Sequence, residues 1–135
     1  MRKILFRGKS TGGIDKWIEG TGVFSDGINT WISFNEPNCA IARGLKHKSV
    51  QPETVGQFTG LYDKNGTKIF EGDILREPYH PERDTVVEWN DGRFRFRHIG
   101  KDHYDYLCFS QDITNYRKII GTIHDNPELL KGETV

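Results

Sequence analysis

The stretch GRFRFRH, residues 92–98, alternates arginine with phenylalanine. Along a β-strand, side chains at alternate positions share one face and lie about 6.6–6.8 Å apart. Arg93, Arg95 and Arg97 are therefore expected to form a cationic row, while the two phenylalanines between them turn inward. The spacing is close to that of successive phosphates in an extended single strand, and arginine also stacks on bases.

Ion pairing is the simpler interpretation of this row. Glu88 is expected to face Arg95 across a hairpin and to neutralise it, with the other two arginines solvated. Nineteen basic and 19 acidic residues give a formal net charge of +0, so composition alone does not favour nucleic-acid or membrane binding. We favour ion pairing and keep binding of nucleic acid, or of another partner, as the alternative.

A second basic cluster comprises Arg43, Lys46 and Lys48, with His47 between the two lysines. If it folds beside the arginine row, it strengthens the binding hypothesis. If the cluster is instead a solvated loop, it adds little support for the binding hypothesis.

Histidines near carboxylates are the other candidates for chemistry. His103 with an acidic neighbour, Asp102 or Asp105, could do acid–base work near neutral pH, but nothing in the sequence directs both side chains toward one target. His80, Glu82 and His98 have no spacing typical of a metal site. We therefore expect no enzymatic activity, no catalytic residues, no cofactor and no metal.

Cysteine usage and the chain start indicate a cytoplasmic protein. Cys39 and Cys108 lie in no CxxC pair, so neither a disulfide framework nor a zinc site is predicted. Cys108 lies in the aromatic run YDYLCFS and is expected to be a small buried hydrophobe. The N-terminal apolar segment is too short for a signal peptide, and no apolar run approaches the roughly 20 residues of a membrane span.

Two hairpins follow from turn residues and cross-strand pairing. With Asn65-Gly66 as a type I′ loop, Asp63 faces Lys68. With Asp91-Gly92 as the loop, Trp89 faces Phe94 and Glu88 faces Arg95. The second hairpin then buries Val87, Trp89, Phe94 and Phe96 on one face.

Short alternating segments predict an all-β fold of antiparallel strands. Further strands are expected at KILFR, WIEGTGVF, TWISF, EGDIL, HYDYLCFS and RKIIGTI, with a turn at Asp26-Gly27 and a short helical turn at Pro127. Residues 1–54 form an N-terminal β region whose segment 36–53 is irregular, with room for one helical turn. Residues 55–135 form a small SH3-like barrel packed with that region.

The segments PETVGQFTGLYDKNGTKIFEGDIL, VVEWNDGRF and IIGTIHDNPELL resemble the YopX family of phage and prophage proteins. The resemblance covers nearly the whole chain and is weakest from Glu36 to Ser49. The matching positions are Thr54, Gly56, Thr59, Gly60, Asp63, Gly66, Gly72, Asp73, Gly121, Asn126, Pro127 and Leu129.

This resemblance implies an SH3-like all-β protein, encoded in phage or prophage genomes, that forms a homo-oligomer in the host bacterial cytoplasm. The family has no established activity, so no functional residues are transferred. We expect a non-enzymatic accessory protein that binds a phage or host protein. The alternative is a nucleic-acid-binding small barrel that uses the arginine row.

Overall fold

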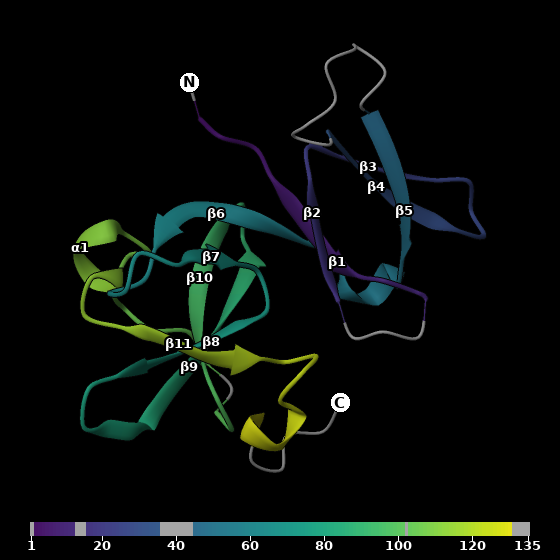
Figure 1. Cartoon of the computed structure of the whole chain (residues 1–135). Helices are drawn as coiled ribbons and strands as arrows, with labels where there is room; N and C mark the ends of the chain where they lie inside the picture. The colour runs from purple at the N-terminus through teal and green to yellow at the C-terminus, as the bar shows by residue number, and fades with distance from the viewer. Residues whose placement is uncertain (1, 13–15, 36–44, 102, 131–135) are drawn as a thin grey trace. The chain divides into compact units, whose positions relative to one another are not determined.

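The structure is a computed structural model that describes residues 2–12, 16–35, 45–101 and 103–130. The chain divides into two compact units, residues 1–58 and 59–135 (Figure 1). Both consist of short antiparallel strands, and the one α-helix in the described ranges has four residues. The prediction of an all-β fold is therefore confirmed. Within the described residues, no helix is long and apolar enough to cross a membrane.

The first unit contains two sheets and a small core. Its elements are β1 (Phe6–Lys9), β2 (Trp17–Gly20), β3 (Gly22–Ser25), β4 (Thr30–Asn35), β5 (Leu45–Val50), the 3-10 helix η1 (Pro52–Thr54) and the start of β6 (Gly56–Tyr62). β1 lies between β2 and β6, and β4 lies between β3 and β5. Ile18, Ile32 and Val50 are buried together and form the core.

The segment WIEGTGVF forms two strands, although the sequence predicted one. β2 pairs with β1 and β3 pairs with β4, so the chain changes partner at Thr21. There the Thr21 amide donates to the Ser33 carbonyl at 2.9 Å. A Cβ on Gly20 would overlap that same carbonyl oxygen, so only glycine permits the approach.

β5 corrects the prediction for residues 36–53. Leu45–Val50 is a strand paired with β4 along its whole length, rather than irregular chain. Lysine and histidine have weak strand preference, and here backbone pairing overrides it. Residues 36–44 lie outside the described part of the chain. The predicted turn at Asp26-Gly27 is confirmed, since the Asp26 carboxylate accepts from the amides of Ile28 and Asn29.

The second unit contains an antiparallel sheet of order β10-β9-β8-β11, together with the pair β6-β7. Its further elements are β7 (Lys68–Phe70), β8 (Asp73–Glu77), β9 (His80–Asn90), β10 (Arg93–His98), α1 (Gln111–Thr114), β11 (Lys118–Thr122) and the 3-10 helix η2 (Pro127–Leu130). Ile69, Leu75, Val87 and Phe96 form its buried core. No described sheet closes on itself, so the SH3-like barrel is not confirmed.

The β9–β10 hairpin has the predicted register. Phe94 pairs with Trp89 and Arg95 pairs with Glu88, and both loop residues have positive φ, 54° at Asp91 and 76° at Gly92. The predicted burial of Trp89 is wrong, because its side chain is 56% exposed. Trp89 shares a face with the core residues, but the hairpin extends beyond the core at this end.

The β6–β7 hairpin differs from its prediction by one residue. The Asp63 amide donates to the Thr67 carbonyl at 2.9 Å, so Thr67 rather than Lys68 faces Asp63. Gly66 has φ 79°, whereas Asn65 is not among the described residues with positive φ, which excludes a type I′ loop. The buried Asp63 carboxylate explains the longer loop, since it accepts from the amides of Asn65 and Thr67 at 2.9 Å each.

The C-terminal third contains one wrong strand and one correct turn. HYDYLCFS was predicted as a strand, but it is irregular apart from an isolated bridge between Arg97 and Tyr104. The aromatic residues of this segment pack through their side chains, without the backbone pairing of a strand. The predicted helical turn at Pro127 is confirmed as η2.

Candidate functional site

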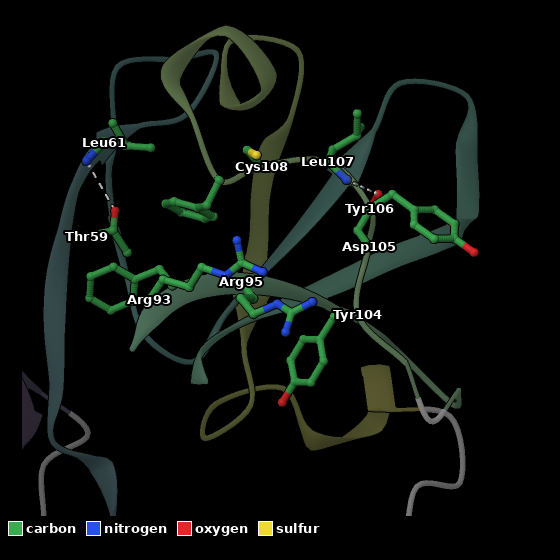
Figure 2. Close-up of a pocket in the computed structure, with 11 residues that line it drawn as sticks. Thr59, Leu61, Arg93, Arg95, Tyr104, Asp105, Tyr106, Leu107 and Cys108 are labelled. Carbon is green, nitrogen blue, oxygen red and sulfur yellow. Dashed lines mark hydrogen bonds between the residues drawn. The ribbon is translucent and has the colours of Figure 1, made fainter. Parts of the chain in front are cut away.

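A pocket of about 570 Å³ lies on the second unit. Thr59 and Leu61 of β6, the first residues of β10 and the irregular segment 104–109 form its walls (Figure 2). Thr59 is fixed there because its hydroxyl donates to the Ile69 carbonyl at 2.8 Å and accepts from the Leu61 amide at 3.2 Å. The pocket volume falls within the range of about 300–1,000 Å³ that is usual for ligand sites.

Two arginines of the predicted row, Arg93 and Arg95, line this pocket. Arg93 is exposed, and Arg95 is half-buried with its guanidinium 4.5 Å from the centre of the Tyr104 ring. Arg95 also donates to the Asn90 side chain at 3.2 Å. Among the described residues, neither guanidinium forms an ion pair with a carboxylate.

Glu88 does not neutralise Arg95, although the two residues pair across the hairpin. Its carboxylate instead accepts from Arg97 Nε at 2.6 Å and from the Tyr104 hydroxyl at 2.9 Å. The predicted Glu88–Arg95 ion pair is therefore wrong. Arg97 is neutralised in its place, and the positive charge that remains lies at the pocket.

Aromatic side chains provide the apolar part of the pocket. Phe94 and Phe109 are half-buried, with ring centres 6.1 Å apart. Phe94 also meets Trp89 edge-on at 4.9 Å, and Phe109 lies 4.8 Å from the buried Phe96 ring. At the rim, the Tyr106 side chain is 100% exposed. Cations and aromatic faces thus share one concave surface.

Asp105 holds the irregular segment of the pocket in place. Its amide donates to the Phe96 carbonyl at 2.8 Å, and its carboxylate accepts from the Leu107 amide at 3.0 Å. The same carboxylate lies 3.4 Å from Arg117, which is buried against the Phe96 ring, and 3.4 Å from His98. The Asp105 carboxylate is therefore engaged by Arg117 and His98, and no ion pair joins it to either pocket arginine among the described residues.

Two titratable groups beside the pocket have shifted pKa values. Burial lowers the pKa of His98 from 6.5; the Asp105 carboxylate opposes this shift, and the charges of His103, Lys101 and Arg117 add to it. Burial and then the hydrogen bond to Glu88 raise the pKa of Tyr104 above 10.0. Tyr104 therefore remains a neutral donor to Glu88 at neutral pH.

The second basic cluster is only partly described. Lys46 and Lys48 are exposed on β5 of the first unit, whereas Arg93, Arg95 and Arg97 lie on β10 of the second. Arg43 and Cys39 fall outside the described residues.

The other candidates for chemistry are dispersed. His80 Nδ1 lies 3.0 Å from Glu82 Oε1, while His98 pairs with Asp105. Residues 2–12, 16–35, 45–101 and 103–130 contain no group of three or more His, Cys, Asp or Glu placed to hold a metal ion.

Sequence reasoning missed that the segment 104–109 forms a wall of the site. Cys108, predicted to be buried, is a free and exposed thiol at the pocket. The density of aromatic residues in YDYLCFS was the available signal, but it was assigned to a strand. Without regular pairing, these side chains are divided between a core contact at Phe109 and an exposed rim at Tyr106.

Comparisons with known proteins place the chain in a family. A crystal structure of protein EF1440 from Enterococcus faecalis is similar with a TM-score of 0.60 and 27% sequence identity, covering 97% of this chain and 100% of that chain. No curated protein matches the chain. The model of the YopX protein family matches residues 6–131. That match covers nearly the whole sequence, and the chain therefore belongs to the YopX protein family.

Proposed function

We propose that this YopX family protein is a non-enzymatic accessory protein of a phage or prophage that acts in the host cytoplasm. It binds a phage or host macromolecule that carries negative charge. Its binding surface is the pocket of the second unit, with Arg93 and Arg95 as the charged contacts.

The observation that carries this proposal is the pair of pocket arginines without a carboxylate partner in the described structure. Arginine side chains that protein carboxylates do not neutralise are suited to bidentate contacts with carboxylate or phosphate groups of a partner. The exposed aromatic rim supplies the large, rigid contact area typical of binding sites. Binding therefore requires no rearrangement of the internal ion pairs.

The acid–base groups near the pocket support binding rather than catalysis. Asp105 is engaged by Arg117, His98 and the Leu107 amide, so its carboxylate positions the chain. His98 lies within this internal network, and its side chain is only 18% exposed. A general base must reach a substrate proton, directly or through one water molecule.

Calorimetric titration tests the binding surface with two anionic probes, a polyglutamate peptide and a short single-stranded oligonucleotide. We expect heat of binding with at least one probe and its loss in the double variant Arg93→Glu/Arg95→Glu. The control, Arg83→Glu/Lys118→Glu, makes the same change in charge at exposed positions outside the pocket. Absence of binding by both probes, or equal binding by the pocket variant, contradicts the proposal.

We also propose that the protein is a homo-oligomer. Exposed apolar side chains of the first unit support this, with Phe24 44% exposed on β3 and Ile28 87% exposed in the following turn. Sedimentation velocity over a range of protein concentrations is expected to give a mass above the 15.6 kDa of one chain. A mass of one chain at every concentration would exclude the oligomer while leaving the pocket proposal intact.

A further inference from the structure

We propose that the ligand of the pocket is single-stranded nucleic acid, with phosphates on Arg93 and Arg95 and bases on the adjacent aromatic side chains. This inference rests on the proposed function of the pocket as a binding surface. It goes further by naming the chemical class of the partner and the role of each contact.

The spacing of Arg93 and Arg95 is close to that of successive phosphates in an extended nucleic-acid strand. They occupy alternate positions of β10, which places them on one face about 6.6–6.8 Å apart. Arg97, the third member of the row, is held by Glu88 at 2.6 Å and does not line the pocket. The site therefore offers two phosphate contacts rather than the three expected from the sequence.

The aromatic groups distinguish nucleic acid from an acidic peptide. Phe94 and Phe109 line the cavity. Tyr104, which also lines it, packs against the Arg95 guanidinium (Figure 2). Tyr106 and Trp89, 100% and 56% exposed, extend the aromatic surface beyond it. Bases stack on aromatic faces in a sequence-tolerant way, whereas aspartate and glutamate side chains have no such interaction.

The cavity favours a single strand over a duplex. About 570 Å³ is enough for a base with its sugar, and Arg93 and Arg95 both line the cavity. The bases of a duplex are already stacked and paired, so entry would require unpairing and unstacking. A single strand can place a base in the pocket while its phosphates remain on β10.

The site is preorganised for such a ligand. Glu88 fixes the Tyr104 hydroxyl at 2.9 Å, and Asp105 fixes the following turn through Leu107 at 3.0 Å. Arg95 is already aligned over the Tyr104 ring. Groups that are held before binding lose less conformational entropy when the ligand arrives.

The test is fluorescence anisotropy of labelled single-stranded DNA and RNA, the corresponding duplexes and a polyglutamate peptide. Two phosphate contacts with a single strand predict a slope of log K against log salt of about −1.4, or about sevenfold weaker binding from about 50 to about 200 mM salt. We expect single strands to bind more tightly than duplexes, and Arg93→Glu/Arg95→Glu to abolish binding.

A second variant separates stacking from charge. Tyr106→Ala changes a fully exposed side chain and leaves both arginines in place. We expect its affinity for single strands to fall by about 5- to 150-fold with an unchanged salt slope. The control Arg83→Glu/Lys118→Glu, with the same charge change as the arginine double variant, is expected to bind as the wild type does.

Four results would overturn the inference. Equal affinity for duplex and single strand, or binding of the acidic peptide alone through Arg93 and Arg95, would exclude single-stranded nucleic acid and leave the proposed binding function standing. Absence of binding by every probe would overturn both proposals. Full retention of single-strand affinity by the Arg93→Glu/Arg95→Glu variant would place any binding elsewhere.

Discussion

At the residue scale, Glu88 decides which arginines of β10 face a ligand. Its carboxylate binds Arg97 and the Tyr104 hydroxyl, although Arg95 is its cross-strand neighbour. A diagonal pair of this kind is accessible to a long arginine side chain, and the tyrosine adds a second hydrogen bond. The positive charge is thereby concentrated on the two residues that line the pocket.

Replacing Glu88 with glutamine tests this arrangement. Loss of the carboxylate weakens the contacts to Arg97 and Tyr104, whose side chains are only partly buried. We therefore expect the free energy of unfolding to fall by about 1 kcal/mol. The pKa of Tyr104 is expected to fall from its raised value, because Glu88 contributes to that increase after burial. A carbon NMR titration of the Tyr104 ring measures the shift; an unchanged pKa would show that Glu88 has no part in it.

Asp63 has a structural role that the sequence did not reveal. Its buried carboxylate accepts from the amides of Asn65, Thr67 and Ile119 at 2.9, 2.9 and 3.0 Å. We expect Asp63→Asn to lower the free energy of unfolding by about 2–3 kcal/mol, since an amide replaces a charged acceptor of several hydrogen bonds.

Chemical denaturation measures this change, and Asp91→Asn provides the control. Asp91 is an exposed turn residue with φ 54°, a conformation that asparagine tolerates. Its substitution is expected to leave stability nearly unchanged. Equal effects of the two substitutions would contradict the structural role assigned to the Asp63 carboxylate.

At the element scale, the junction of β2 and β3 depends on Gly20. A Cβ there would overlap the Ser33 carbonyl oxygen, which is backbone and cannot rotate away. We expect Gly20→Ala to destabilise the protein by about 2 kcal/mol or more. In the matched variant Gly22→Ala, the new Cβ would meet only the Ser33 hydroxyl at 2.7 Å, which can turn aside. Thermal unfolding compares the two, and a larger loss in Gly22→Ala would contradict the proposed close approach.

The segment 104–109 is expected to make stability depend on pH through His98. Its pKa is lowered in the folded state chiefly by burial, so the unfolded chain binds more protons as the pH falls below 6.5. The stabilisation that His98 contributes is therefore present above pH 6.5 and is lost as the pH falls through the folded-state pKa of His98. Urea denaturation at several pH values should show a shallower decline in His98→Gln. An identical decline in both proteins would exclude His98 as the cause.

Pairing of strands was predictable where turn and core signals agreed. The β9–β10 register follows from Asp91-Gly92 and from the alternation that buries Val87 and Phe96. The predicted β6–β7 register was wrong by one residue, because the sequence cannot reveal that Asp63 is buried. β5 was not predicted because its lysines and histidine do not indicate a strand, and its strand conformation depends on pairing with β4.

At the whole-molecule scale, the sequence indicated the all-β class and the family but only part of the site. Arg93 and Arg95 were identified from their spacing, yet the pocket needs segment 104–109, which is remote from β6 in sequence. Its placement depends on Asp105 contacting Arg117 and His98, and no local pattern encodes such contacts. Exposure of Cys108 and Trp89 likewise depends on where the core ends.

The most direct test of the central claim is an NMR titration that observes the Nε–H signals of the arginine side chains as a single-stranded oligonucleotide is added. We predict shifts for Arg93 and Arg95, which line the pocket, and a nearly constant signal for Arg97, whose Nε–H is held by Glu88. Unchanged Arg93 and Arg95 signals at saturating oligonucleotide, or shifts confined to arginines outside the pocket, would contradict the account.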